Sequence, residues 1–174
     1  MEIIFVLIVV VLILAVSFYN QLIRSKAKVL ESFSGIDVAL EKRYSVLMNL
    51  NETVKAAAKH EENVLIKLVQ CRSSMTLSEK ESLNEQYNQT EKVLLAIAEA
   101  YPELKVNQNF IALQKAIVDC EEHLQAARRF YNANVSDYNV KIDSFPTNLF
   151  ASMMNLEKAR FFETENRDLP KVNF

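Results

Sequence analysis

Two histidines have the most obvious capacity for metal chemistry in this chain. His60 is followed by Glu61 and Glu62, and a zinc-protease helix has a histidine and a glutamate in this order. Such a site also needs a second histidine four residues after the first, so that both imidazoles reach one metal ion. Position 64 is Val64, so the sequence predicts no zinc site here.

The carboxylate-bridged di-iron centre of helical bundles is a second metal chemistry, and it requires Glu-x-x-His pairs on facing helices. The residues three positions before His60 and His123 are Ala57 and Cys120. Neither histidine therefore belongs to such a pair. We expect both to lie on partly solvated helix faces, with no bound metal and no cofactor.

Cys71 and Cys120 are the candidate nucleophiles. Cys71 precedes Arg72, and a neighbouring cation can activate a thiol. Neither cysteine has a histidine beside it in a defined geometry to act as a base. The single glycine of the chain also excludes a glycine-rich phosphate loop. We therefore predict that the protein is not an enzyme and has no catalytic residues.

Arg128 and Arg129, beside Phe130 and Tyr131, are the candidate patch for nucleic acid or lipid headgroups. Tyr131, however, falls on an apolar helical stripe, which favours a packed helix over a binding surface. The net charge of −2 provides no general attraction to nucleic acid. We expect these arginines to form solvated ion pairs and the protein to bind no nucleic acid.

Asn132 and Asn139 are seven residues apart, so they share one helix face beside that stripe. A side-chain amide both donates and accepts hydrogen bonds, and can bridge two helices. Within one bundle the two amides would fix the register of neighbouring helices, whereas between copies they would specify assembly. Both alternatives stay open, and these residues are the candidate assembly contacts.

The first element that must position these side chains is an apolar run over Ile3–Tyr19, interrupted only by Ser17. Its first twelve residues favour bilayer insertion by roughly 4 to 7 kcal/mol. A helix satisfies its own backbone in lipid, and at about 1.5 Å per residue this one nearly spans a core of about 30 Å. A signal peptide cleaved near residues 15–17 is the alternative, but only Glu2 precedes the run, where a signal has cations. We predict a transmembrane anchor over residues 1–23.

Three cations, Arg24, Lys26 and Lys28, follow the run closely. Beside a membrane span they lie at the headgroups, where each contributes about 1 kcal/mol of attraction to anionic lipid. We predict that they contact lipid. The positive-inside bias places the N-terminus outside and residues 24–174 in the cytoplasm.

Residues 24–174 suffice for one domain, and one glycine and three prolines leave little turn punctuation for hairpins. An apolar stripe at spacings of three and four residues predicts the first helix. The stripe resumes at Leu65 and Leu68, which extends this helix to about Ser73 if it is continuous. Its first part consists of Phe33, Ile36, Leu40, Tyr44, Leu47, Leu50, Val54 and Ala58.

A second helix is predicted to start at Ser78, because Ser78 and Glu81 have the spacing of a capping box. It should stop near Tyr101, since Pro102 disfavours helical geometry in the residue before it. The residues from Pro102 to Asn107 then form the connection to the next helix.

The third predicted helix has the clearest stripe and ends at Pro146, and a short fourth helix reaches toward Arg160. The stripe consists of Phe110, Leu113, Ile117, Cys120, Leu124, Ala127 and Tyr131, a spacing typical of bundles. The predicted fold is all-α, with a transmembrane helix followed by an elongated antiparallel bundle of three or four helices.

Several blocks of sequence resemble the LemA family of bacterial membrane proteins. They include Ser34-Gly35-Ile36-Asp37-Val38, Lys42-Arg43-Tyr44, Glu52-Thr53-Val54-Lys55, His60-Glu61, Tyr101-Pro102-Glu103-Leu104-Lys105, Ala127-Arg128-Arg129-Phe130-Tyr131-Asn132, Phe145-Pro146-Thr147-Asn148 and Pro170-Lys171-Val172. The resemblance covers nearly the whole chain and implies a single N-terminal span, an outside N-terminus and a helical bundle. It implies no reaction, although one branch of the family is associated with magnetosome membranes.

The favoured function is therefore a non-enzymatic scaffold or assembly protein at the inner leaflet of the bacterial cytoplasmic membrane. Its expected partners are the lipid bilayer, further copies of itself and other membrane proteins. The runner-up is an accessory or regulatory subunit of a membrane enzyme or protease complex. A third alternative is a protein that shapes the membrane directly.

Overall fold

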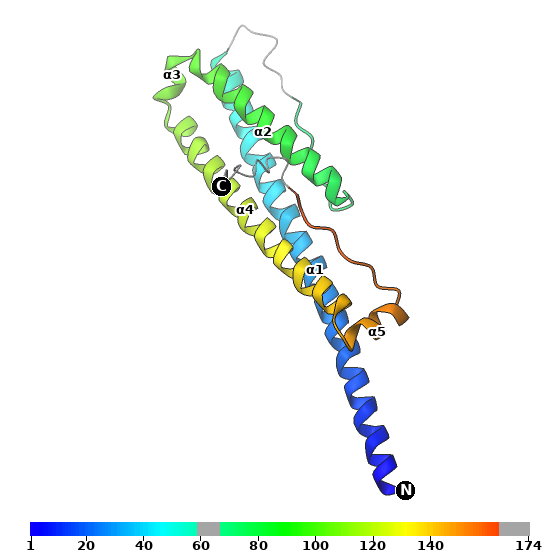
Figure 1. Ribbon diagram of the computed structural model, residues 1–174. Helices are drawn as coiled ribbons and strands as arrows, with labels where there is room; N and C mark the ends of the chain where they lie inside the picture. Colours follow the sequence, from blue (N-terminus) through cyan, green and yellow to red (C-terminus); the bar gives the residue numbers. More distant parts are fainter. Residues whose placement is uncertain (59–66, 164–174) are drawn as a thin grey trace, which may run out of the picture. The chain divides into compact units, whose positions relative to one another are not determined.

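The structure is a computed structural model that describes residues 1–58 and 67–163, and over these residues it contains helices and no strand. The helices are α1 (Glu2–Ala57), α2 (Leu77–Glu99), α3 (Pro102–Lys105), α4 (Gln108–Asp143) and α5 (Thr147–Met153) (Figure 1). The prediction of an all-α fold is confirmed. His60, Glu61, Glu62, Val64 and the closing Pro170-Lys171-Val172 lie outside the described residues.

Helix α1 is a single helix of 56 residues that passes through the predicted anchor boundary at residues 23 and 24 without a break. Gly35 lies inside it, with open space around the position of a β-carbon. The predicted continuation to about Ser73 is wrong, because residues 67–72 are not helical. The carbonyl oxygen of Val69 instead accepts a hydrogen bond of 2.6 Å from the Tyr87 hydroxyl of α2.

Helix α2 begins one residue earlier than predicted and has a different cap. Thr76 is the N-cap, and its hydroxyl and backbone N–H pair reciprocally with the backbone N–H and the carboxylate of Glu79. The capping box predicted at Ser78 and Glu81 is therefore shifted by two residues. The Thr76 pair has the same three-residue spacing, so spacing alone does not choose between the two pairs.

The remaining helices end close to their predicted bounds, with two differences. The predicted connection before α4 contains the short helix α3, which starts at Pro102. Proline has no backbone N–H, and it suits this position because the N–H groups of a first helical turn have no partner within the helix. The fourth helix stops at Met153 and does not reach Arg160. Asn155 there adopts a left-handed backbone with φ of 49°, a conformation that ends a helix and that asparagine tolerates.

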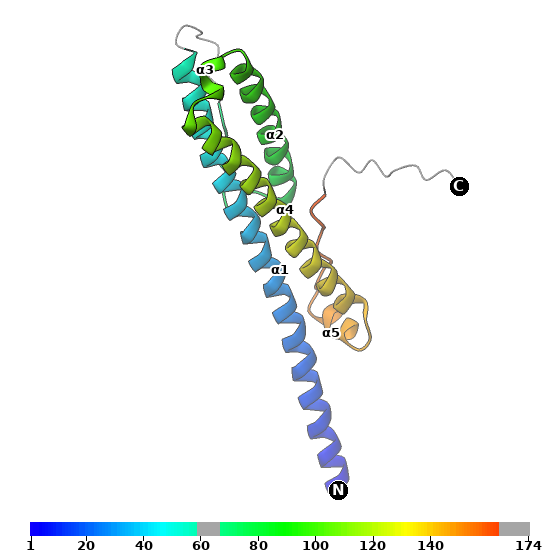
Figure 2. The ribbon, with the colours of Figure 1, turned by 90° about the vertical axis from the view of Figure 1, so that its left-hand side faces the viewer.

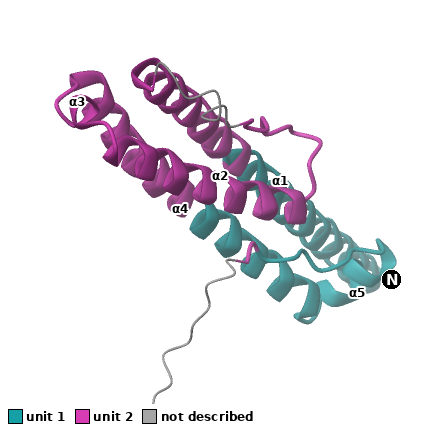
Figure 3. Ribbon diagram, turned by 90° about the horizontal axis from the view of Figure 1, so that it is seen from above, with its two compact units in different colours: residues 1–35, 127–161 teal, residues 36–126, 162–174 magenta. Residues whose placement is uncertain are grey.

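The chain divides into two compact units, each with its own packing (Figure 3). Unit 1 contains residues 1–35 and 127–161, and unit 2 contains residues 36–126 and 162–174. In unit 1 the Phe33 and Tyr131 rings lie 5.7 Å apart between centroids, and Ser25 contacts Asp137. These contacts show that α1 and α4 run antiparallel in this unit. The buried side chains include Leu22, Val29, Val135 and Tyr138.

Unit 2 is built from α1, α2, α3 and α4, and helical stripes supply its apolar core. The stripe predicted in the first helix is buried from Ile36 onward, except that Tyr44 is only partly buried. The core residues include Ile36, Leu40, Leu47, Leu50, Val54, Leu83, Tyr87, Leu94, Ile117, Cys120 and Leu124. The stripe of the third predicted helix is confirmed at Phe110, Ile117, Cys120, Leu124 and Tyr131.

Helix α2 runs parallel to α1 within unit 2, which differs from the antiparallel arrangement expected from the sequence. Lys80 pairs with Asp37 and the Tyr87 ring packs on that of Tyr44, so both helices advance by seven residues between the contacts. The start of α2 therefore lies about 30 Å back along α1 from its end. Figures 1 and 2 show α2 ascending beside α1 and α4 returning from α3.

Candidate functional site: the buried Arg43 cluster and the membrane-proximal residues

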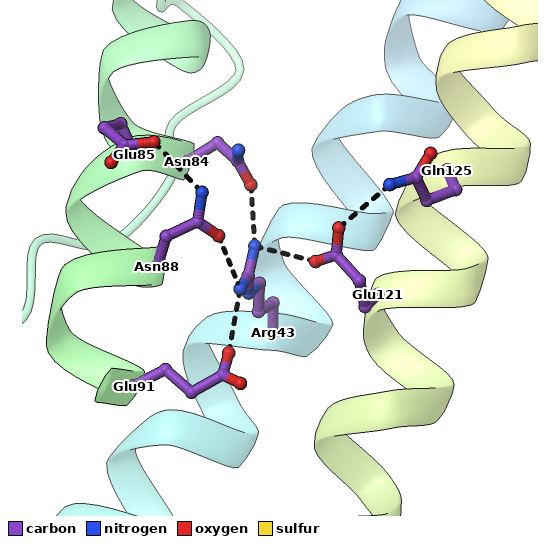
Figure 4. Close-up of polar contacts among 7 residues, drawn as sticks. All are labelled: Arg43, Asn84, Glu85, Asn88, Glu91, Glu121 and Gln125. Atoms are coloured by element: carbon purple, nitrogen blue, oxygen red, sulfur yellow. Dashed lines mark hydrogen bonds and ion pairs between the residues drawn. The ribbon is translucent and has the colours of Figure 1, made fainter. Parts of the chain in front are cut away.

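Unit 2 contains a group of polar side chains around Arg43, which we call the Arg43 cluster: Arg43, Asn84, Asn88, Glu91 and Glu121 (Figure 4). The Arg43 side chain is 3% exposed. Its Nη1 donates to Asn84 Oδ1 at 2.7 Å and lies 3.0 Å from Glu121 Oε2. Its Nη2 donates to Asn88 Oδ1 at 2.8 Å and to Glu91 Oε2 at 2.9 Å. One guanidinium thus contacts both α2 and α4.

Arg43 occupies a core position of α1, which the sequence analysis assigned to Tyr44. Buried residues of α1 recur at Ile36, Leu40, Arg43, Leu47 and Leu50, so they alternate steps of four and three. That alternation is the spacing of a helix seam. A stripe restricted to apolar residues passes over Arg43 and includes the next residue, Tyr44, instead. Requiring strict four-and-three spacing would have found the buried arginine.

Helix α2 presents the matching polar residues along its own seam. Lys80, Asn84, Tyr87, Glu91 and Leu94 follow each other at steps of four, three, four and three, so polar and apolar side chains mix on one face. Lys80 has no exposed side-chain area and forms an ion pair with Asp37. The sequence analysis did not identify either residue as paired.

Two outer hydrogen bonds orient the members of the cluster. Asn88 Nδ2 donates to Glu85 Oε2 at 3.1 Å, which turns its amide oxygen toward Arg43. Gln125 donates to Glu121 at 3.2 Å. The pKa of the Glu85 carboxyl is lowered by hydrogen bonds, first from Gln89 and then from Asn88. Glu121 is therefore held by both Arg43 and Gln125, and Asn88 by both Arg43 and Glu85.

The chemistry of the Arg43 cluster is that of a structural lock. Buried charges cost several kcal/mol of desolvation each unless paired and hydrogen-bonded, and Arg43 has four close partners here. A helix that slid by one residue would separate these partners. The best-attested use of such buried polar groups is to specify register, and the cluster can do this for three helices.

Both cysteine thiols are poorly suited to nucleophilic chemistry. Burial raises the pKa of the Cys71 thiol, and Asp37 raises it further. Burial likewise raises the pKa of the Cys120 thiol. A thiol with a raised pKa carries little of the reactive thiolate at neutral pH.

The predicted lipid contacts Arg24, Lys26 and Lys28 are exposed side chains of α1 in unit 1. Ser25, between them, is buried and donates to Asp137 Oδ2 at 3.2 Å. The three predicted cations are thus accessible, and Lys28 is close enough to Asp137 to help lower the pKa of that carboxyl.

Asp137 is the acidic partner of this region on α4. Lys141 Nζ donates to Asp137 Oδ2 at 2.6 Å. This hydrogen bond lowers the pKa of the Asp137 carboxyl, and Ser25 contributes in the same direction. Sequence reasoning missed this pair, although the i, i+4 spacing of Asp137 and Lys141 was a usable signal.

The two candidate assembly contacts differ in their surroundings. Asn139 Nδ2 donates to the carbonyl oxygen of Ala159 at 2.9 Å, and its Oδ1 accepts from the Ala159 N–H at 2.9 Å. Both polar groups of this amide are therefore used within the chain, tying the segment after α5 to α4. Asn132 is partly buried on the same helix.

The expectation that Arg128 and Arg129 are both solvated is wrong for the first. Arg128 is 7% exposed, whereas Arg129 and Phe130 are exposed. Arg128 lies between the buried residues Leu124 and Tyr131 at steps of four and three, so the seam includes it. As at Arg43, periodicity places a long basic side chain in the core.

The first part of α1 has the length and apolar composition to cross a membrane, and it is the one such helix among the described residues. Its apolar side chains are exposed rather than packed. A solvent-exposed surface of this size is typical of a membrane contact. Together with the packed helices that follow, it defines the class of a membrane-associated helical protein.

Comparison with known proteins identifies the family within this class. Residues 32–174 match the LemA family, and the chain belongs to that family. Protein LemA of Metamycoplasma hominis is 27% identical over 149 residues, which are 83% of this chain and 68% of that protein. The prediction of the family from the sequence is confirmed.

Magnetosome proteins are also similar to part of the chain. Magnetosome protein MamQ 2 of Paramagnetospirillum magneticum is 29% identical over 70 residues, and MamQ of Magnetospirillum gryphiswaldense is 28% identical over 69 residues. Each match covers 40% of this chain and about a quarter of the magnetosome protein.

Proposed function

We propose that the protein is a non-enzymatic, membrane-anchored helical scaffold that associates with further copies of itself. One observation carries the proposal: the exposed apolar part of α1 continues as the same helix into the packed core of the family domain. The anchor and a core helix are thus one covalent element. A domain attached to the bilayer in this way has a raised effective concentration for lateral contacts.

The interior of unit 2 supports a structural role. The Arg43 guanidinium contacts four polar side chains on two other helices, and Lys80 forms an ion pair with Asp37. Both thiols have a raised pKa. The polar groups that most resemble a site are therefore committed to holding helices in register, which leaves the outer helix surfaces for binding.

The outer surface of α4 supplies apolar groups for such binding. Phe130 is 61% exposed, and Val140 is also exposed on this helix. Asn132 follows Phe130 by two residues and therefore faces a different side of α4. We propose that Phe130 and Val140 contact a second copy, while Asn139 serves the chain's own fold. The assembly contact predicted at Asn132 stays a prediction.

We further propose that the N-terminus faces outward and that the domain lies in the cytoplasm, at the inner leaflet of the bacterial cytoplasmic membrane. The exposed cations Arg24, Lys26 and Lys28 support this orientation, because cations beside a span favour the cytoplasmic side.

Self-association is tested by the mass of the full-length protein in lipid nanodiscs large enough for several copies, and in mild detergent, by light scattering. We expect a mass above that of the monomer. Phe130→Ser should shift the distribution toward monomer, whereas Val106→Ser, which removes another exposed apolar side chain, should not. A monomer across a wide concentration range in both media would contradict the scaffold and favour an accessory subunit of another complex.

Orientation is tested separately with protease added to intact spheroplasts. The domain should be spared until the membrane is permeabilised, and then digested. Digestion in intact spheroplasts would reverse the topology. Recovery of a soluble fragment beginning after Ser17 would instead indicate a cleaved signal.

A further inference from the structure

We propose that α5 and the preceding Phe145 form a second membrane contact, which inserts into the headgroup boundary of the bilayer beside the anchor. The contacting surface, which we call the α5 face, consists of Phe145, Leu149 and Met153. This inference concerns a lipid surface only. It depends on the anchoring of α1 and is independent of self-association.

The position of α5 next to the anchor comes from a contact inside unit 1. The ring of Phe150 on α5 lies 6.0 Å from the ring of Phe18 on α1, measured between centroids. Phe18 belongs to the apolar run predicted to lie in the membrane. Figures 1 and 2 both show α5 lying alongside the early part of α1.

The depth of this contact matches an interfacial element. Phe18 precedes Ile23, the last residue of the predicted anchor, by five residues, or about 7.5 Å along the helix. Amphipathic segments that lie on a membrane bury their apolar face about 5–10 Å into the boundary between headgroups and acyl chains. A segment packed against Phe18 lies at the depth where such burial occurs.

The two sides of α5 differ as an interfacial helix requires. Thr147 and Ala151 are buried, and the Thr147 hydroxyl donates to the Ser144 carbonyl oxygen at 2.9 Å. Leu149 and Met153 fall two positions later, on the opposite side of the helix. They are 56% and 80% exposed, and Phe145 is 81% exposed. The apolar side chains therefore face away from the protein.

The charge pattern around α5 is complementary to a bilayer boundary. Residues 144–156 carry no charged side chain, the longest uncharged stretch after the N-terminal run. Charged residues resume on both sides, at Asp143 and at Glu157 and Lys158, and Lys158 pairs with Asp143 at 2.8 Å. Entry of the α5 face into the boundary therefore requires no charge to leave water.

A tryptophan reporter tests the proposal directly, because the chain has no tryptophan of its own. Leu149→Trp is made in the full-length protein and reconstituted into vesicles of phosphatidylcholine and phosphatidylglycerol. Bromine atoms on the lipid acyl chains, placed near the headgroup or near the methyl end, quench nearby tryptophans. Met153→Trp is a second reporter on the same face, and circular dichroism verifies the fold of each variant.

Two reference variants calibrate the measurement. Val11→Trp, in the middle of the apolar run, should be quenched most by bromine near the methyl end. Val38→Trp, exposed on α1 about 22 Å past Ile23, the last residue of the predicted anchor, should emit as in water and be quenched little. The Val11 reference also reports on anchoring itself, so failure of the anchor is distinguishable from failure of the α5 face.

We expect Leu149→Trp and Met153→Trp to emit at shorter wavelength than Val38→Trp. Bromine near the headgroup should quench both several-fold more than it quenches Val38→Trp. Emission and quenching equal to those of Val38→Trp, with Val11→Trp quenched, would overturn the proposal. A blue shift without quenching, or one that disappears as the protein is diluted in lipid, would also overturn it and assign the face to a second copy.

Discussion

The two units of this protein differ in their exposed apolar surface, although each buries an arginine, Arg43 in unit 2 and Arg128 in unit 1. In unit 2 charged side chains lie inside, where Arg43 and Lys80 are almost fully buried and paired. In unit 1 large apolar side chains lie outside, along the first part of α1 and on the α5 face. The same helices, α1 and α4, contribute to both units.

The proposed membrane position of unit 1 accounts for this difference. Apolar groups can remain outside where lipid surrounds them, because lipid tails are as apolar as leucine. In unit 2 the apolar helical stripes are buried, and apolar contacts give little directional information. A few paired charges then fix the register.

The largest expected effect compares two leucines that differ in their surroundings. Leu124→Asp places an unpaired carboxylate at a fully buried site of unit 2 and should lower the free energy of unfolding by about 4 kcal/mol or more. Leu149→Asp in unit 1, on an exposed face, should change it little in detergent. Thermal unfolding followed by circular dichroism measures both. Equal effects would show that the two leucines do not differ in burial.

The next effect concerns the charged interior. Arg43→Met leaves the amides and carboxylates of its partners without their donor and should cost about 3 kcal/mol. Removing one partner of a buried ion pair costs about 3–5 kcal/mol. We expect the lower end of that range, since Glu91 and Glu121 are partly exposed and can recover water. Arg129→Met, at an exposed position of α4, is the matched control and should be nearly neutral. Denaturant unfolding measures both variants. An Arg43→Met variant with an unchanged free energy of unfolding would contradict the structural lock.

A smaller effect distinguishes the observed cap from the predicted one. Thr76→Ala removes the N-cap of α2 and should cost about 1 kcal/mol. Ser78→Ala, which removes the hydroxyl of the cap expected from sequence, should cost less. Unfolding midpoints of the two variants give the order directly, and the reverse order would favour the Ser78 cap.

The smallest effect is the pH dependence of the Asp137 pair in unit 1. The pKa of Asp137 is lowered in the folded state, chiefly by the hydrogen bond from Lys141, so its contribution is present above the unfolded value of about 3.9. It is lost as pH falls through the folded pKa. Because the carboxylate is largely exposed, the contribution should be below about 0.5 kcal/mol.

The test compares Asp137→Asn with the parent chain over a series of pH values. The variant should be slightly less stable near neutral pH, and the difference should close below about pH 4. A difference that persists or grows in acid would show that the pair does not carry the titration.

Much of the helical framework follows from residue spacing. The stripe of α4 and the core stripe of α1 were predicted because steps of three and four place apolar side chains on one face. Helix ends were less predictable where a local conformation decided them. Asn155 ends α5 through a left-handed backbone, and the spacing of capping residues fitted both Thr76 and Ser78.

The buried polar residues were missed for a related reason. Apolar periodicity ignores charged side chains, so it passed over Arg43 and placed Arg128 in solvent. Whether an arginine belongs to a seam depends on partners from other helices, such as Asn84 and Glu121. Those partners are distant in sequence, and no local pattern connects them.

The sequence by itself determined the all-helical class, the N-terminal apolar helix and the family, because composition and periodicity are local properties of the chain. Only the tertiary structure decided that α2 runs parallel to α1, since the spacing of apolar residues is the same whichever way a helix runs beside its neighbour. It also decided that Arg43 is a core residue, that Asn139 is used within the chain, and that Phe150 of α5 packs against Phe18. Each of these depends on contacts between residues far apart in sequence, which packing alone brings together.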